Sequence, residues 1–468
     1  MSSIADTKAP GSHFYKSYIR GEFFFGFWNI VSRGIGFVNT FITLAFLTVY
    51  QYGVFQLILA SYAGLSIFIA LGGETIRNDV LRYVGEKNIA AAKKLFFEST
   101  LVRILIGIVL WIIVYFGAPL LASKYSPDFI YYIQLISFLF IHDSVLPSVT
   151  QLLEVDRDFN LIAVRASVSK FVQFFVLGYY FLFSRIGLRE VILSLVIASF
   201  VSLVFLLIIV LRRFFTTWHL VPALKEGLLH RLIFSYGKWE LLRPLAAKFS
   251  NFTQVWLTKI FIGTETVAIF SVAQTMIGTL GNLLPDNTLS VLIPMHVGDK
   301  KKMQKIYTLS SKYMVLLSIV MGLVALVLAP PFIRIFFPKY VSSLPLFSVM
   351  LFTLPISALI IIPSHFLIAY RKQGFLFLQK MLKAFVGAAL YVLLIPFFGV
   401  WGLVFQMIIL YLFLYIVIYV YMSKADMEVF IDWRRILHFD NSDKELMKMV
   451  FADGIKYCRK WLPSFLKS

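Results

Sequence analysis

The chain has 468 residues, of which 59% are hydrophobic and only 15% are charged. Soluble globular domains are about 45–50% apolar and about 25% charged, so this composition excludes an ordinary soluble fold and indicates a protein embedded in lipid. The net charge of +20 does not indicate nucleic acid as a partner, because Lys and Arg gather in alternate loops between apolar stretches, as in membrane proteins that follow the positive-inside rule.

Twelve stretches of the chain are apolar and long enough to cross a bilayer, for which about 20 residues are needed. The first follows a polar segment without a cleavage-site pattern, so we expect a retained span and no signal peptide. The predicted spans are residues 23–46, 54–73, 104–122, 129–152, 162–183, 191–211, 239–262, 267–292, 313–332, 344–369, 379–398 and 400–422. The sequence therefore predicts an all-α polytopic membrane protein with about 12 transmembrane helices.

The second half of the chain repeats the first. The segment FLTVYQYGVFQLILA, which begins at Phe46, corresponds to FIGTETVAIFSVAQ, which begins 215 residues later at Phe261. Downstream, VGEK at Val84 corresponds to VGDK at Val297, 213 residues later. A nearly constant offset indicates an internal duplication, so we expect two homologous lobes of six helices each.

Loop charge predicts how the lobes are oriented. Loops rich in Lys and Arg are expected on the cytoplasmic side of an inner or plasma membrane, which also places both termini there. Each lobe has an even number of spans, so the lobes should be parallel repeats with a site between them at mid-membrane. The expected parts are a cytoplasmic segment (1–22), an N-lobe (23–215), a cytoplasmic linker (216–238), a C-lobe (239–422) and a basic tail (423–468). The tail is expected to be an amphipathic helix on the cytoplasmic membrane surface; a soluble docking helix is the alternative.

The first helix of each lobe has a polar face. In the first span, polar and small residues are spaced three or four apart, which places them on one side of a helix: Asn29, Ser32, Gly36, Asn39 and Thr43. The corresponding positions of the seventh span are Ala247, Asn251, Gln254 and Thr258. One cation lies beside each face, Arg33 in the first lobe and Lys248 in the second, again 215 residues apart.

These cations are candidates for binding an anion. A charge deep in the bilayer costs at least ~2.5–3.5 kcal/mol, so it usually faces a wet cavity or a partner. We therefore expect Arg33, Lys248 and Arg243 to line a cleft and attract a phosphate, for which Arg offers two parallel hydrogen bonds. In the alternative reading they extend to an interface or pair with Glu240. The amides predicted to hydrogen-bond the rest of the substrate are Asn29, Asn39, Asn251 and Gln254.

Two charged groups at cytoplasmic helix ends are candidates for a gate or a coupling site. Lys238 and Glu240 begin the seventh span, and Glu74 and Arg77 lie in a mixed cluster with Asp79 and Arg82. The spacing of three in that cluster also suits ion pairs on a solvated helix end, which is the alternative reading.

No stretch of the sequence indicates catalysis. The motifs HExxH, GxGxxG and GxSxG and the P-loop are missing, so we expect neither an enzyme nor a cofactor or metal site. Asp156 and Asp158 form a DxD triplet that we interpret as a solvated turn. His142 and Asp143 can form a proton relay, but buried, hydrogen-bonded polar residues are the commoner case. Whether Na⁺ or H⁺ serves as a coupling ion is left open.

Several segments resemble a known family. These are SRGIGFVNTFITLAFLTVYQYGVFQLILA with the following VLRYVGE, FIGTETVAIFSVAQ in the second lobe, and IPFFGVWGLVFQ before the last span. Together they resemble the Wzx-type polysaccharide flippases of the MOP superfamily, and the likeness covers nearly the whole chain to about Met422. The resemblance implies a two-lobed all-helical flippase that moves undecaprenyl-pyrophosphate-linked oligosaccharides across the cytoplasmic membrane by alternating access. It also implies membrane lipids, a polysaccharide polymerase and chain-length regulators as partners, and a cationic lumen.

Other classes of membrane protein remain as alternatives. Peptidoglycan-precursor flippases share the Ser32-Arg33 pair but usually have a second Arg about two turns later, where this chain has Asn39. MATE cation or multidrug antiporters tend to place a carboxylate within the first lobe's spans, whereas the first span here has only Glu22 at its edge. A non-transporting scaffold of a glycan assembly complex is the third alternative, and it would tolerate loss of the polar faces.

Overall fold

The computed structural model describes residues 28, 30–69, 73–121, 127–156, 158–217, 227–229, 238–284, 293, 300–370 and 372–424, and the description below is confined to them. Regular structure in this part of the chain is helical throughout. The predicted tail (423–468) and N-terminal segment (1–22) lie almost wholly outside the described residues, so the amphipathic helix expected in the tail stays a prediction.

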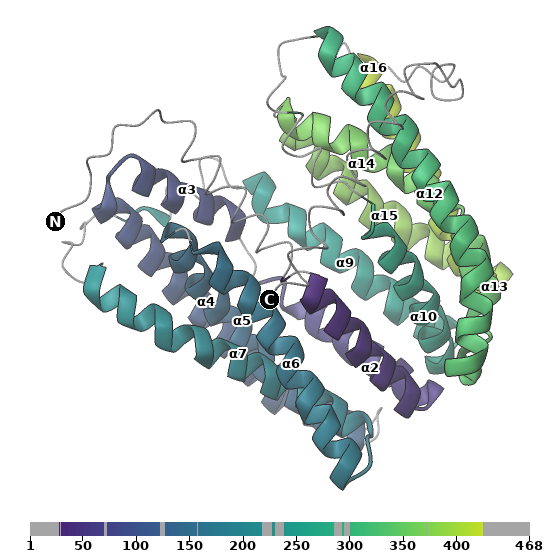
Figure 1. The fold of residues 1–468 in the computed structure, drawn as a ribbon, viewed down its shortest axis with the longest axis horizontal. Coiled ribbons are helices and arrows are strands. Elements are labelled where there is room, and N and C mark those ends of the chain that lie inside the picture. Colours follow the sequence, from purple (N-terminus) through teal and green to yellow (C-terminus); the bar gives the residue numbers. More distant parts are fainter. Residues whose placement is uncertain are drawn as a thin grey trace, which may run out of the picture. The chain divides into compact units, whose positions relative to one another are not determined.

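The helices follow one another through short connections (Figure 1). The first half contains a helix over Ile30–Phe46, then α2 (Val49–Leu65), α3 (Gly73–Gly85), α4 (Ile89–Gly117), η1 (Ala118–Leu121), α5 (Pro127–Val155), α6 (Phe159–Phe183) and α7 (Leu188–Thr217). The second half contains α9 (Lys238–Phe261), α10 (Thr264–Gly281), α12 (Lys300–Phe336), η3 (Pro338–Tyr340), α13 (Ser343–Met350), α14 (Thr353–Ala369), α15 (Gln373–Phe398) and α16 (Val400–Lys424).

Every predicted span overlaps one of these helices, which confirms the all-α polytopic class. Among the described residues, seven helices are long and apolar enough to cross a membrane, or eight if the bent pair α13 and α14 counts as one span. The helix Ile30–Phe46 is apolar but has only 17 described residues. Charged residues such as Lys248 and Lys259 lower the mean hydropathy of α9.

The second span begins and ends earlier than predicted. A capping box starts α2: Thr48 Oγ1 accepts a hydrogen bond from the Gln51 N–H at 3.2 Å, and the Gln51 side chain accepts one from the Thr48 N–H at 3.1 Å. The helix then ends at Leu65, where the predicted span continued to residue 73. The T-x-x-Q pattern is a known start signal, so the start was readable from the sequence.

Packing divides the chain into two compact units. The first comprises Met1–Thr275, Leu328–Val349 and Gln373–Leu410, and the second comprises Met276–Val327, Met350–Lys372 and Tyr411–Ser468. The lobe boundary expected at residues 216–238 remains a prediction.

Within the first unit, α4 packs against α5, α7 packs against both α5 and α6, and α9 packs against α2 and α15 (Figure 1). A cluster of Val149, Leu153, Leu203 and Leu206 fills the contact between α5 and α7. Because lipid is as apolar as these side chains, the contact stabilises the helix pair by van der Waals packing.

Small residues allow the closest approaches between helices of the first unit. A Cβ atom placed on Gly107 of α4 would lie 2.5 Å from Ser144 Cβ of α5. A Cβ atom on Gly53 of α2 would lie 2.1 Å from the backbone oxygen of Thr264, the first residue of α10. Both distances are too short for a side chain, so glycine is required if the helices are to pack this closely.

A lysine closes the end of the first helix. Lys339 Nζ, in η3, donates hydrogen bonds to the backbone oxygens of Ala45, at 2.9 Å, and Leu47. The last carbonyl groups of a helix lack intrahelical partners and have a partial negative charge, so a cation stabilises them.

In the second unit, an aromatic contact joins α12 to α14. The Tyr307 ring meets the Phe366 ring edge-on, with centroids 5.0 Å apart, and both side chains are fully buried.

Candidate functional site

The predicted cation Lys248 lies in a position fixed by a helix end. Its Nζ atom donates a hydrogen bond of 2.8 Å to Ser66 Oγ, and its side chain is partly buried. Ser66 is the C-cap of α2, and its own N–H bonds back to the Tyr62 carbonyl. The carbonyl end of α2 has a partial negative charge, which favours an ammonium group beside it.

A carboxylate lies near this lysine. Asp143, in the middle of α5, accepts a hydrogen bond from the Tyr62 hydroxyl on Oδ2 and lies 2.8 Å from His142 Nδ1 on Oδ1. Its charge also interacts with those of Lys248 on α9 and Arg165 on α6. The structure therefore brings one carboxylate and two cations together from three helices of the first unit.

Local sequence adds a polar backbone group at Asp143. Pro147 lies within α5, four residues after Asp143. A proline has no N–H and cannot donate to the carbonyl four residues earlier, so the Asp143 carbonyl loses its intrahelical partner. This oxygen adds negative potential beside the two cations.

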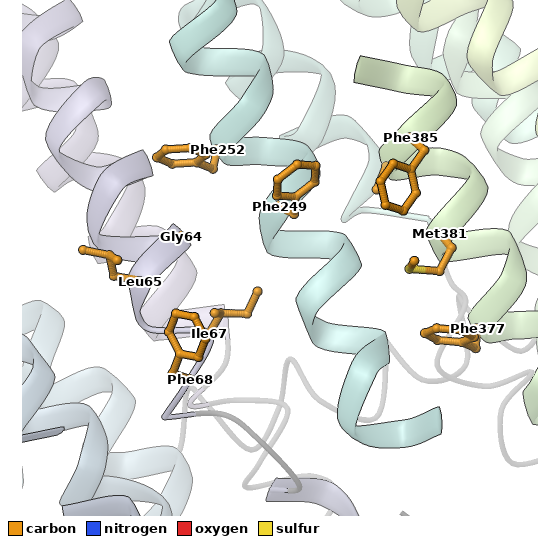
Figure 2. A pocket seen from close by; sticks show the side chains of 10 residues that line it. Gly64, Leu65, Ile67, Phe68, Phe249, Phe252, Phe377, Met381 and Phe385 are labelled. Carbon is orange, nitrogen blue, oxygen red and sulfur yellow. The ribbon is translucent and has the colours of Figure 1, made fainter. Parts of the chain in front are cut away.

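An apolar cavity of about 430 Å³ lies beside Lys248. Its walls come from α2 with the turn after it, from α9 and from α15, as Figure 2 shows: Gly64, Leu65, Ile67, Phe68, Phe249, Phe252, Phe377, Met381, Ala384 and Phe385. Lys248 directly precedes Phe249, and its partner Ser66 lies between Leu65 and Ile67. The Lys248–Ser66 hydrogen bond therefore borders the cavity.

The predicted residues of the first span have different surroundings. Arg33 is exposed, whereas Asn39 is buried at 2% exposure. Asn39 Nδ2 donates to the Lys170 carbonyl at 2.9 Å and to Gln173 Oε1 at 3.3 Å, both on α6. Its amide nitrogen therefore joins two helices, and a role toward substrate stays a prediction. Asn29 lies outside the described residues.

The predicted residues of α9 are described only beyond position 247. Asn251 is exposed, and Gln254 is buried with an amide nitrogen that has no hydrogen-bond partner among the described residues. The side chains of Lys238, Glu240 and Arg243 lie outside the described part of the chain. Their roles stay predictions.

The predicted gate cluster contains an ion pair within α3 and one that leaves it. Arg82 pairs with Asp79 at 3.3 Å, as the spacing of three predicts. Arg77 instead pairs with Glu154 of α5, with Nε and Oε2 3.2 Å apart. The side chain of Glu74 lies outside the described part.

Sequence reasoning did not assign several of these residues to the site. Asp143 was interpreted as a buried polar residue, and its hydrogen bonds to Tyr62 and His142 agree with that, but the two nearby cations were not foreseen. A carboxylate in the middle of a predicted span, four residues before a proline, was the available signal. Ser66, Tyr62 and Arg165 gave no comparable signal.

A family model described as polysaccharide biosynthesis protein matches residues 19–298, which is more than half of the chain. The chain belongs to this family. No curated protein sequence matches the chain.

Solved structures share the fold of this family member. An inward-facing multidrug resistance MATE family transporter of the MOP superfamily aligns with a TM-score of 0.69 at 12% identity, over 85% of this chain and 98% of that one. The Vibrio cholerae MATE transporter VcmN aligns with a TM-score of 0.60 at 15% identity, over 89% and 99%. A MOP superfamily transporter from Pyrococcus furiosus aligns with a TM-score of 0.54 at 13% identity, over 87% and 94%. The family match and the shared fold make this a polysaccharide biosynthesis protein of the MOP superfamily and a multi-pass membrane protein.

Proposed function

We propose that this protein is a flippase that translocates undecaprenyl-pyrophosphate-linked oligosaccharides across the cytoplasmic membrane by alternating access, and not an enzyme. The observation behind the proposal is the cation Lys248 at the border of an apolar cavity lined by aromatic rings. An anionic group joined to a long hydrocarbon chain suits such a border, because the two parts require opposite surroundings. The match to a polysaccharide biosynthesis family supports a glycan as the third part of the ligand.

In this proposal each group of the substrate has its own residues. The pyrophosphate binds Lys248, with Arg33 and Arg243 as further cations. The first isoprene units lie in the cavity between α2, α9 and α15, and the rest of the chain stays in lipid. The amides Asn29, Asn39, Asn251 and Gln254 hydrogen-bond sugar hydroxyls, and Gln254 has an amide nitrogen free to do so among the described residues.

The proposed direction of movement follows from orientation and charge. The loops rich in Lys and Arg are cytoplasmic in this proposal, and both termini are cytoplasmic with them. A membrane potential that is negative inside favours outward movement of an anion by about 2.3 kcal/mol per charge per 100 mV. If the cations that bind the pyrophosphate move with it, this contribution disappears, and Na⁺ or H⁺ has to supply the energy. Glu74, Arg77, Lys238 and Glu240 are then the proposed gate or coupling residues.

The shared fold with multidrug transporters raises a second candidate, the export of lipophilic cations. An aromatic cavity suits such ligands as well. Lys248 argues against it, because an ammonium group beside the cavity repels a cation.

Binding to the protein in lipid nanodiscs tests the proposal against this candidate. The probe is a polyprenyl-pyrophosphate monosaccharide, with the uncharged polyprenol and tetraphenylphosphonium as comparisons. We expect selective binding of the pyrophosphate lipid. Binding of the phosphonium cation in its place would reject the proposal.

A further inference from the structure

The last turn of α2 contacts two opposite charges. The Tyr62 hydroxyl donates to Asp143, and Ser66, four residues later, accepts from Lys248. Side chains four residues apart lie on the same face of a helix, so this turn holds a carboxylate from α5 and an ammonium group from α9 side by side. Arg165 on α6 is a second cation that interacts with Asp143. Asp143 is therefore shared between two cations from two different helices.

We propose that Asp143 is an internal counter-ion that the substrate's pyrophosphate displaces from Lys248 and Arg165. The inference rests on the proposed function, since it takes the ligand to be a polyprenyl pyrophosphate. In the empty site, the carboxylate balances the two cations and lowers the cost of keeping them within the membrane. In the loaded site, phosphate oxygens bind the ammonium and the guanidinium in its place.

The displaced carboxylate then requires a new partner. Beside bound phosphates, and without its cations, a charged Asp143 would be repelled strongly in a medium of low dielectric constant. A proton taken from water removes this repulsion, and Tyr62 and His142 remain as hydrogen-bond partners of the neutral acid. Binding of the lipid and of one proton therefore favour each other, and by linkage each raises the affinity for the other by the same factor.

Other groups packed around α5 were considered as the proton acceptor. His142, beside Asp143 on α5, is buried against Phe200 of α7 and is the main competitor. On α4, Arg103 is buried, and a guanidinium keeps its proton at every accessible pH. On α3, Arg77 pairs with Glu154 at the far end of α5, and on α6 Lys170 accepts from Asn39 through its carbonyl. Asp143 and His142 are therefore the two groups to separate by experiment.

The test is binding of a polyprenyl-pyrophosphate monosaccharide to the full chain in nanodiscs as a function of pH. This probe keeps its charge near neutral pH, because both phosphates are esterified on one side. The proton uptake that accompanies binding is measured by calorimetry in two buffers of different ionisation enthalpy. We expect uptake approaching one proton per ligand and an affinity that rises by up to about tenfold per unit fall in pH.

Variants assign the effect to a residue. Asp143→Asn removes the competing charge, so we expect tenfold or tighter binding at neutral pH and no dependence on pH. His142→Gln should keep the pH dependence. Asp79→Asn removes an ion-paired carboxylate of α3 and is the matched control, with no expected change. Neutral polyprenol should bind all four proteins equally. If Asp143→Asn does not fold, the wild-type proton uptake together with His142→Gln decides the question.

Each outcome separates the inference from the proposed function. Selective binding of the probe without proton uptake, or pH dependence that disappears in His142→Gln, would overturn the inference and leave the flippase standing. No binding of the probe at any pH would overturn both.

Discussion

Lys248 of α9 and Ser66 at the end of α2 are 182 positions apart in the chain and joined by a hydrogen bond of 2.8 Å. The bond places the cation that sequence duplication singled out beside an apolar cavity and near the carboxylate of Asp143. A cation, a carboxylate and an apolar wall therefore meet within the first unit, and the predictions below follow from this arrangement.

Replacing Lys248 should weaken binding of the anionic lipid. A charge-assisted hydrogen bond contributes about 1.5–3 kcal/mol, so Lys248→Met should bind a polyprenyl-pyrophosphate sugar about 10- to 100-fold more weakly. Lys248→Arg should retain most of the affinity, because it keeps the charge. Ser66→Ala removes only the positioning partner and should have a smaller effect. Equal binding by Lys248→Met and the wild type would remove this residue from the site.

Filling the apolar cavity should interfere with the lipid tail. Ala384 of α15 lines the cavity, and a tryptophan there would occupy the volume assigned to the first isoprene units. Each buried CH₂ contributes about 0.8 kcal/mol, so Ala384→Trp should weaken binding of the lipid at least tenfold. Leu393→Trp, on the exposed surface of α15, is the control and should bind as the wild type does. Comparable affinities for the two variants would place the tail elsewhere.

The pair between Arg77 and Glu154 joins α3 to α5 and tests the predicted gate. Arg77 is half-exposed, so loss of this ion pair should cost less than about 1 kcal/mol of stability. If the pair controls a gate, Arg77→Glu should slow transport with little change in melting temperature. Combining it with Glu154→Arg should then restore the rate. Arg82→Ala, which breaks a pair within α3, is the control. Failure of the double exchange to restore transport would argue for a surface ion pair without a gating role.

Gly53 should be required for folding and not for binding. An alanine Cβ would overlap the backbone of Thr264, and overpacking of this kind costs about 1–3 kcal/mol. Gly53→Ala should therefore lower the melting temperature and the yield of folded protein. Gly34→Ala meets no atom within 4 Å and should be neutral or stabilising. An unchanged melting temperature for Gly53→Ala would mean that α2 and α10 are packed less closely.

The transmembrane architecture could be predicted from the sequence because hydropathy and helix formation are local properties. The apolar runs gave every span, and the duplication singled out Lys248 as the counterpart of Arg33. The contacts of Lys248 could not be predicted, because Ser66 and Asp143 approach it only when α2, α5 and α9 pack together. The same applies to Arg77, for which spacing suggested a partner within α3, while the structure provides Glu154 from α5.

The cavity illustrates a second limit. Its lining residues are ordinary apolar side chains of three spans, and nothing in their spacing distinguishes them from residues that face lipid. Only packing shows that Phe252 of α9 and Phe385 of α15 border the same volume. Asp143 lies between these cases, since its place within a span was visible and its cationic neighbours were not.

The most direct test of the central claim is translocation in proteoliposomes. A fluorescent polyprenyl-pyrophosphate oligosaccharide is incorporated, and its appearance in the opposite leaflet is followed for the wild type, Arg33→Ala, Lys248→Ala and Leu393→Trp. We predict movement by the wild type and by Leu393→Trp, and loss of movement in both cation variants while they remain folded and correctly inserted. Wild-type rates in Arg33→Ala and Lys248→Ala, or no movement by the wild type over a panel of glycan head groups, would contradict the account.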